Sequence, residues 1–401
     1  MWTILAQGTQ LIAGVLLVKM LTSQLSLADY GLFALIMAVS AFVLTIPFTA
    51  IQQGFYRYRS VYNQKNRKGE FYSSMMMGVT ILIVIYTGLA YLVLVNIKVD
   101  KLWVNLFTLI VMLVTSEIYK IFTRCIINAD RQRKIYAQSI IVEFLLKCGL
   151  LLSISFLWKV MSIPTILIIY SLANIISILI CVYPHFKTIT FINIKQFKIV
   201  WLRILLFSTP LLLWAGFGWL RDMSMRWFLE LHTNTEQVAI FTALSSIALM
   251  VPMIIQSVVG AYFIPIMYEN AKQGDKVKKQ LQQLINALLV IGLILFILIY
   301  LCSPIILELL TDHKYVQYAW ALPWMFISYY LFCCGMINAT SLLVDFKPEK
   351  LFIPNLLSGG VVLFSGLFVV EHYGLNAAII SYCISYGVYF LSSYIVVLKN
   401  K

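Results

Sequence analysis

The sequence contains few charged residues for its length. Asp, Glu, Lys and Arg make up only 11% of its 401 residues, whereas 61% are hydrophobic. A soluble globular chain has about 25% charged and about 45–50% apolar residues. Because a water-soluble core of this size cannot hide such an apolar excess, the composition excludes an ordinary soluble protein and predicts a chain that is solvated by a lipid bilayer.

The sequence also lacks the common signatures of catalysis and of metal binding. It contains no G-x-S-x-G, P-loop, H-E-x-x-H or Rossmann glycine pattern, and its four histidines are scattered. The seven cysteines form no C-x-x-C pair and have no zinc-ligand spacing. We therefore expect a protein that is not an enzyme, with no cofactor and no metal site.

The net charge of +14 is spread along the chain. The basic residues do not form a single patch but recur in short clusters between apolar runs. This pattern favours a membrane surface with anionic lipids as the partner and argues against nucleic acid.

Twelve apolar runs are long enough to cross a bilayer, for which about twenty residues are needed. The loops between them are short. The predicted spans are 4–21, 31–53, 71–96, 102–122, 135–157, 163–183, 205–226, 238–264, 281–301, 318–342, 351–370 and 375–398.

The distribution of Lys and Arg predicts the orientation of these spans. With the N-terminus inside, the inner segments hold 21 of the 30 basic residues, the outer segments hold six, and Lys19, Lys120 and Lys147 lie within spans. Cytoplasmic loops carry such an excess. We therefore expect both termini to be cytoplasmic in an all-α membrane protein.

The longest predicted loop, about 184–204, falls near the middle of the chain and separates six spans from six. Two halves of six spans have the same orientation, which is typical of repeats related by an axis along the membrane normal. We therefore predict an N-terminal six-helix bundle over 1–200 and a C-terminal six-helix bundle over 201–401.

Ionisable residues inside spans are the best candidates for function, because each costs a few kcal/mol in hydrocarbon and normally faces a partner or a cavity. Lys19 lies near the outer end of the first span, where it either snorkels to headgroups or serves a site. Glu117 and Lys120 in the fourth span, and Glu143 and Lys147 in the fifth, have spacings that place each pair on one helix face. They either neutralise each other or line a cavity.

The seventh span ends in a second cluster, with Arg221, Asp222 and Arg226 among aromatic residues. Asp222 and Arg226 are four residues apart and either pair at the headgroups or take part in a site. Taken together, cations partly offset by carboxylates inside an apolar bundle favour an anionic ligand. A diphosphate suits them, since Arg forks onto phosphate oxygens and Lys acts as a point charge.

Three segments carry a resemblance to a known family. The chain opens with WTILAQG at 2–8 and continues with LSLADYGLFAL at 25–35; RDMSMRW at 221–227 leads on to VAIFTA at 238–243; and YFIPIMYE covers 262–269. These segments resemble the Wzx-type O-antigen flippases of the multidrug/oligosaccharidyl-lipid/polysaccharide exporter superfamily. The sequence departs from the family pattern at Met225, where an aspartate is usual, and at Ala239, where a glycine is usual.

The resemblance implies a MATE/flippase-like fold and a transporter of the bacterial inner membrane. Such a protein moves an undecaprenyl-diphosphate-linked oligosaccharide, the repeat unit of O-antigen, lipopolysaccharide or another surface polysaccharide, by alternating access through a cationic central cavity. A polysaccharide polymerase and assembly proteins are then expected partners. Lys19, Arg221 and Arg226 are the positions carried over first, followed by Lys147 and Lys120.

Two alternatives remain open from the sequence. An ion-coupled multidrug antiporter has the same bundle, but its cavity usually features membrane carboxylates, and the first span here has Lys19 and no acid. A membrane enzyme of polysaccharide assembly needs a large outer loop, and the sequence has none of that length.

Overall fold

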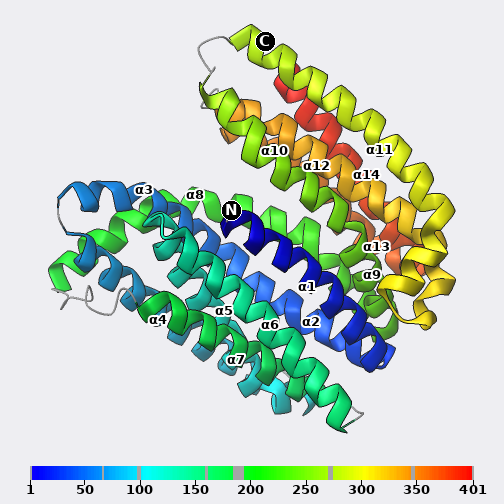
Figure 1. The fold of residues 1–401 in the computed structure, drawn as a ribbon, viewed down its shortest axis with the longest axis horizontal. Helices are drawn as coiled ribbons and strands as arrows, with labels where there is room; N and C mark the ends of the chain where they lie inside the picture. The colour runs from blue at the N-terminus through cyan, green and yellow to red at the C-terminus, as the bar shows by residue number, and fades with distance from the viewer. Residues whose placement is uncertain are drawn as a thin grey trace. The chain divides into compact units, whose positions relative to one another are not determined.

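The computed structural model describes residues 2–65, 67–96, 101–158, 161–183, 194–269, 274–344 and 348–399. Throughout these ranges the chain is helical, with short turns between the helices and no strand (Figure 1). The all-α class predicted from the apolar runs is therefore confirmed.

The elements follow one another without long excursions. The first part of the chain forms α1 (Trp2–Gln24), α2 (Leu27–Val43), the π-helix η1 (Leu44–Thr49), α3 (Ala50–Gln64), α4 (Lys68–Asn96), α5 (Lys101–Ala129), α6 (Arg133–Trp158) and α7 (Ile163–Val182). The second part forms α8 (Ile194–His232), α9 (Thr235–Ala248), α10 (Met250–Glu269), α11 (Gly274–Leu310), η3 (His313–Ala321), α12 (Leu322–Val344), η4 (Pro348–Leu351), α13 (Phe352–Phe368) and α14 (Val370–Leu398).

The described residues contain 11 helical segments that are long and apolar enough to cross a membrane, and α8 brings the number to 12 when its two parts are taken as one span. These parts, Ile194–Thr209 and Leu211–His232, meet at 53°. Pro210 stands between them, and a proline in a helix lacks the N–H that would bond four residues back. The predicted number of about twelve spans is confirmed, while the cytoplasmic placement of the termini stays a prediction.

Several predicted boundaries are wrong, because hydropathy falls at charged residues where backbone hydrogen bonding continues. The predicted span 31–53 is part of one helical run, Leu27–Gln64, that passes through the π-helix at Pro47. The span 205–226 belongs to a helix that continues to His232, and 238–264 is divided between α9 and α10. Of the predicted loop 184–204, residues 184–193 lie outside the described residues, and the remainder is helical.

The chain divides into two compact units. Unit 1 comprises Met1–Leu17 and Val39–Gly216, and unit 2 comprises Val18–Ala38 and Phe217–Lys401. Three helices, α1, α2 and α8, therefore contribute residues to both units. The division into six-helix bundles at residue 200 stays a prediction.

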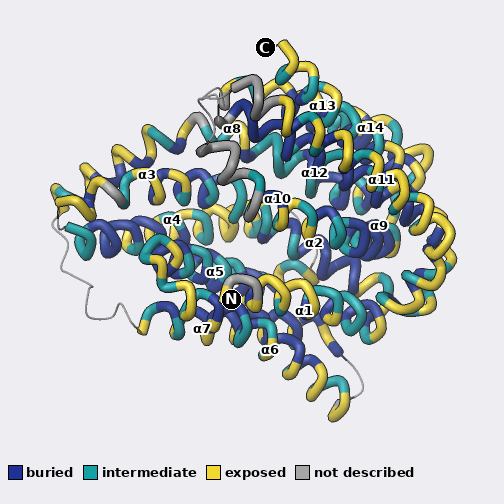
Figure 2. The backbone as a smooth tube through the Cα atoms, turned by 45° about the horizontal axis from the view of Figure 1, so that its top comes forward, coloured by how far each residue is buried: buried dark blue, intermediate teal, exposed yellow. Residues whose placement is uncertain are grey.

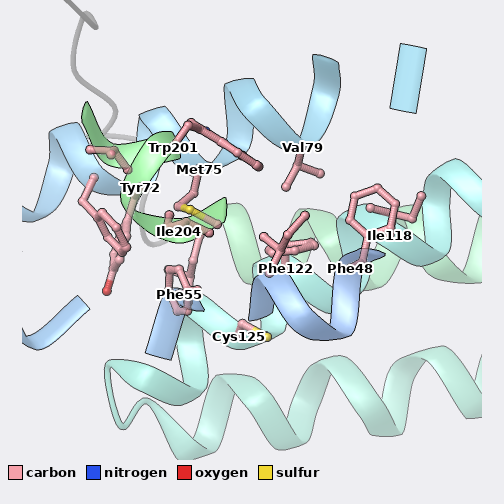
Figure 3. Close-up of a cluster of buried hydrophobic side chains, with 14 of the residues drawn as sticks. Phe48, Phe55, Tyr72, Met75, Val79, Ile118, Phe122, Cys125, Trp201 and Ile204 are labelled. Carbon is pink, nitrogen blue, oxygen red and sulfur yellow. The ribbon is translucent and has the colours of Figure 1, made fainter. Parts of the chain in front are cut away.

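Unit 1 is built on helices α5, α6 and α7, with α7 packed against the other two. A separate apolar cluster joins α3, α4, α5 and the start of α8 (Figure 3). In this cluster Trp201 donates a hydrogen bond to the carbonyl of Ser74 and covers Gly78, whose lack of a side chain leaves room for the indole. The members labelled in Figure 3 are Phe48, Phe55, Tyr72, Met75, Val79, Ile118, Phe122, Cys125, Trp201 and Ile204.

Unit 2 is centred on α12, which packs against α14 and α11, while α13 packs against α14. Its interior is rich in tyrosine: Tyr330, Tyr382, Tyr386 and Tyr389 are fully buried. The outward faces carry large apolar side chains, and exposed residues recur along α11 (Figure 2). An apolar exterior around a core with polar groups is the arrangement expected of a protein in lipid.

Candidate functional site

Unit 1 contains a buried network of five charged side chains. Glu117, Lys120 and Arg124 follow one another on α5 at spacings of three and four, and Glu143 and Lys147 are four apart on α6. Since such spacings place residues on one helix face, each helix presents a charged stripe. The packing of the helices brings the two stripes together in one cluster.

Glu143 is the centre of this network. Its Oε1 accepts hydrogen bonds from Lys147 Nζ at 2.6 Å and Lys120 Nζ at 2.9 Å, and its Oε2 accepts one from Arg124 Nη2 at 2.6 Å. Only 3% of the Glu143 side chain is exposed. Glu117 supplies the second carboxylate, with its Oε2 2.8 Å from Lys120 Nζ. Three cations thus share two carboxylates, which leaves a formal charge of +1.

Neutral groups complete the network. Asn174 on α7 accepts from Lys120 Nζ at 2.9 Å and donates to Glu117 Oε1 at 2.9 Å. Arg124 also donates to the hydroxyl of Ser177 at 3.0 Å, and Lys147 Nζ lies 4.4 Å from the centroid of the Tyr170 ring. The two lysines of this cluster are therefore held in place by carboxylate groups, an amide and an aromatic ring.

Unit 2 contains the second cluster, which is centred on α8. Arg221 forms a two-fold contact with the adjacent Asp222, from Nε to Oδ1 at 2.8 Å and from Nη2 to Oδ2 at 3.0 Å. Its Nη1 donates to Asn355 Oδ1 on α13 at 2.8 Å. The guanidinium carbon also lies 4.2 Å from the centroid of Phe332 and 5.2 Å from that of Tyr389. The guanidinium of Arg221 thus has hydrogen-bond acceptors for its N–H groups and aromatic rings beside its plane.

The partners of Arg226 are of a different kind. Its Nε donates to Thr242 Oγ1 at 3.1 Å, and its Nη1 donates to the carbonyl of Asp222 at 3.0 Å and contacts Met223 Sδ at 3.3 Å. Arg226 is only 8% exposed. Among the described residues no carboxylate lies within ion-pair distance of it. It is a buried guanidinium surrounded by neutral groups.

The contact between Arg226 and Thr242 follows from the α8–α9 turn. Asn234 caps α9 by accepting the backbone N–H of Gln237, which fixes the turn between the two helices. Arg226 and Thr242 are each eight residues from Asn234. An antiparallel pair of helices brings such equidistant positions together.

Lys19 belongs to neither cluster. Its Nζ donates to the carbonyl of Glu308 at 2.7 Å and to that of Thr311, at the C-terminal end of α11. A cation at this end of a helix binds carbonyls that have no partner within the helix and complements the helix dipole. Conversely, Lys314 Nζ donates to the carbonyl of Leu25, just after α1, at 2.6 Å. The two helix ends are thus capped reciprocally.

A further ionic cluster is centred on Asp130, which lies outside the spans at the α5–α6 turn. Asp130 Oδ1 accepts from Arg59 Nη2 at 2.7 Å and from the Tyr72 hydroxyl at 2.6 Å, and Oδ2 lies 2.6 Å from Lys68 Nζ. Burial acts to raise the pKa of Asp130, but the bonds from Lys68, Tyr72 and Arg59 outweigh it and hold the pKa below its usual range. This carboxylate ties α3 and α4 to the turn.

The structure therefore brings the predicted residues together in two groups. Glu117, Lys120, Glu143 and Lys147 form one; Arg221, Asp222 and Arg226 form the other. Sequence reasoning missed the contacts of Arg124 and the partners Asn174 and Asn355, although a lone amide in a span was a usable signal. It also missed the aromatic face of α14, where Tyr382, Tyr386 and Tyr389 follow at spacings of four and three.

Neither cluster has the composition of a metal site. The described residues contain no group of three or more His, Cys, Asp and Glu side chains placed to hold a metal ion. The charged groups of both clusters are instead arranged as ion pairs and hydrogen bonds.

Comparison with known proteins identifies the family. Residues 1–271 match the family model described as polysaccharide biosynthesis protein. The chain belongs to this family. A comparison of the chain with curated proteins finds no match.

Solved transporters share the fold of this chain. An inward-facing multidrug resistance MATE family transporter of the MOP superfamily superposes with a TM-score of 0.74 at 15% identity, over 99% of this chain and 98% of the other. The lipid II flippase MurJ in an inward closed conformation has a TM-score of 0.73 at 13% identity, over 98% and 86%. The Vibrio cholerae MATE transporter VcmN in the bent form has a TM-score of 0.62 at 13% identity, over 99% and 97%.

These likenesses confirm the predicted MATE/flippase-like fold. The family match and the apolar helices together support a multi-pass membrane protein. The substrate is a separate question, which the two charged clusters address.

Proposed function

We propose that this protein flips a lipid-linked oligosaccharide across the bacterial inner membrane. The substrate is an undecaprenyl-diphosphate-linked repeat unit of O-antigen or another surface polysaccharide, and transport proceeds by alternating access. A polysaccharide polymerase and assembly proteins receive the product at the outer leaflet. Family membership and the flippase fold support the class of transporter, and the charges of the clusters support the diphosphate.

Arg226 is the observation that carries this proposal. Its guanidinium is buried in a membrane span, and its contacts within the described residues are neutral. A charge within a span carries an insertion cost, which reaches about 2.5–3.5 kcal/mol at the centre of the span. A group kept at that cost without a carboxylate has unused capacity for an anion, and a planar guanidinium matches phosphate oxygens by forked hydrogen bonds.

The depth of Arg226 fits a headgroup in transit. Six residues separate it from the end of α8 at His232, which at 1.5 Å per residue is about 9 Å. A lipid diphosphate that meets Arg226 has therefore left the aqueous edge of the span. Since polar groups without partners cost several kcal/mol in hydrocarbon, a positive side chain at this depth lowers the barrier to crossing.

The paired carboxylates argue against a cationic substrate. Glu117 and Glu143 contact lysines, and Asp222 contacts Arg221. A multidrug antiporter for organic cations needs a carboxylate that is free to meet its substrate. The arrangement of both clusters therefore favours an anion over a cation.

The test is transport by the full-length protein reconstituted in liposomes. The substrate is a short undecaprenyl-diphosphate-linked saccharide, and a sugar-modifying enzyme added outside the vesicles reports the fraction in the outer leaflet. We expect wild type to equilibrate the two leaflets. R226M should reduce the rate at least tenfold, and R226K should retain part of it, because lysine keeps the charge but not the fork.

A matched control is R203M, which removes an exposed arginine from the same helix. It should leave the rate within about twofold of wild type, as expected for a surface change. No flipping by wild type, or full activity of R226M, would overturn the proposal. Transport of an organic cation such as ethidium by wild-type protein, without flipping of the lipid-linked saccharide, would favour the multidrug antiporter.

A further inference from the structure

Asp222 does not have the partner that its position suggests. It stands four residues before Arg226 on α8, a spacing at which opposite charges meet and stabilise a helix. Its two carboxylate oxygens instead bind Arg221, the preceding residue in the chain. Adjacent residues on a helix do not face each other. Contacts from outside the helix must therefore hold this pair together.

Three other helices make these contacts and fix the side chain of Arg221. Asn355 on α13 accepts from its Nη1 at 2.8 Å. Phe332 on α12 and Tyr389 on α14 lie 4.2 Å and 5.2 Å from the guanidinium carbon, so the planar group is enclosed by rings. Arg221 is only 5% exposed. It is held at one position and presents its Nε and Nη2 to Asp222.

The same packing orients Asp222. The Tyr386 hydroxyl donates to Asp222 Oδ1 at 3.0 Å, and the Tyr382 hydroxyl donates to the Asp222 carbonyl at 2.9 Å. That carbonyl is also the acceptor for Arg226 Nη1 at 3.0 Å. Arg226 thus reaches the backbone of Asp222 but not its carboxylate. The side chain of Asp222 is still 37% exposed, so it has room to turn.

We propose that Arg221 is a positioning residue that sequesters the charge of Asp222 and so leaves the charge of Arg226 available to an anion. Two arginines compete for one carboxylate, and the aromatic enclosure decides the competition in favour of Arg221. Without Arg221, Asp222 turns to Arg226, and the site becomes a neutral ion pair. Arg221 therefore sets the preference of the site for anions without touching the substrate. This inference rests on the proposed function, since it assigns the anion to Arg226.

The experiment measures binding of inorganic diphosphate to the purified full-length protein by calorimetry. In R221M the carboxylate is free to neutralise Arg226, and we expect affinity to fall at least tenfold. In the double variant R221M/D222N the competing charge is absent, and affinity should return to within about threefold of wild type. If Arg221 only stabilised the fold, R221M protein that remains folded and monodisperse would bind diphosphate as tightly as wild type.

R221Q provides a second route should R221M not fold, since glutamine can still bond to Asn355. All variants are first checked for a monodisperse peak in detergent. Unchanged affinity in R221M and R221Q overturns the inference, and so does an R221M/D222N variant that folds but binds no better than R221M. R226M separates this inference from the proposed function. If R226M binds diphosphate as tightly as wild type, the proposed anion site fails, whatever the behaviour of Arg221.

Discussion

Replacing Glu143 by glutamine should destabilise unit 1 more than any other single charge removal in its network. Glu143 accepts hydrogen bonds from Lys120, Arg124 and Lys147, whereas Glu117 is within 2.8 Å of one lysine and 4.0 Å of the other. The substitution keeps the shape of the side chain but leaves three buried cations with one carboxylate. The local formal charge rises from +1 to +2.

The size of the effect follows from burial. Only 3% of the Glu143 side chain is exposed, and removing one partner of a buried ion pair costs about 3–5 kcal/mol. For a cooperative unit of about 150–250 residues, each kcal/mol lowers Tm by roughly 2–4 °C, so E143Q should lower Tm by about 10 °C. E117Q should have a smaller effect, because 12% of the Glu117 side chain is exposed and it has fewer close cations.

The assay is thermal unfolding of purified protein in detergent, with E236Q as a control. Glu236 is an exposed glutamate on α9, and its replacement should change stability by no more than about 0.5 kcal/mol. The double variant E143Q/K147M restores the local charge to +1 and should recover part of the lost Tm. A Tm of E143Q within 2 °C of wild type, or a Tm of E143Q/K147M no higher than that of E143Q, would refute this explanation by local charge.

Three further changes test other contacts. A Cβ at Gly78 would lie 1.8 Å from the Trp201 ring, so G78A should lower the free energy of unfolding by about 1–3 kcal/mol. G88A is the control, because a Cβ at Gly88 has nothing within 4 Å, and it should cost far less in the same thermal unfolding assay. K19M removes the cation at the C-terminal end of α11 and should lower the free energy of unfolding by about 0.3–1 kcal/mol. The affinity for diphosphate should not change. A loss of affinity equal to that of R226M would instead place Lys19 in the anion site. Because the folded pKa of Asp130 is lowered from 3.8, its stabilisation is present above that pH and is lost as pH falls through the lower folded value. D130N should therefore be less stable at neutral pH by about 1–3 kcal/mol and lose less stability on acidification, as followed by melting from pH 7 to pH 3.

The sequence by itself determined the solvent of this protein and most of its helices. Long apolar runs have few ways to satisfy their backbone groups in lipid, so helices follow from composition alone. Local charge pairs were also predictable, because helical spacing brings Glu117 to Lys120 and Glu143 to Lys147 without help from the rest of the fold.

Only the tertiary structure decided which of several available partners each charge takes. Spacing favours Asp222 with Arg226, but contacts from Asn355, Phe332 and Tyr389, more than a hundred residues away, turn Asp222 to Arg221. Lys19 likewise meets carbonyls at the end of α11, nearly three hundred residues along the chain. The physical reason is that a buried charge takes the partner that packing delivers within about 3 Å, and packing between distant helices leaves no periodic trace in a single sequence.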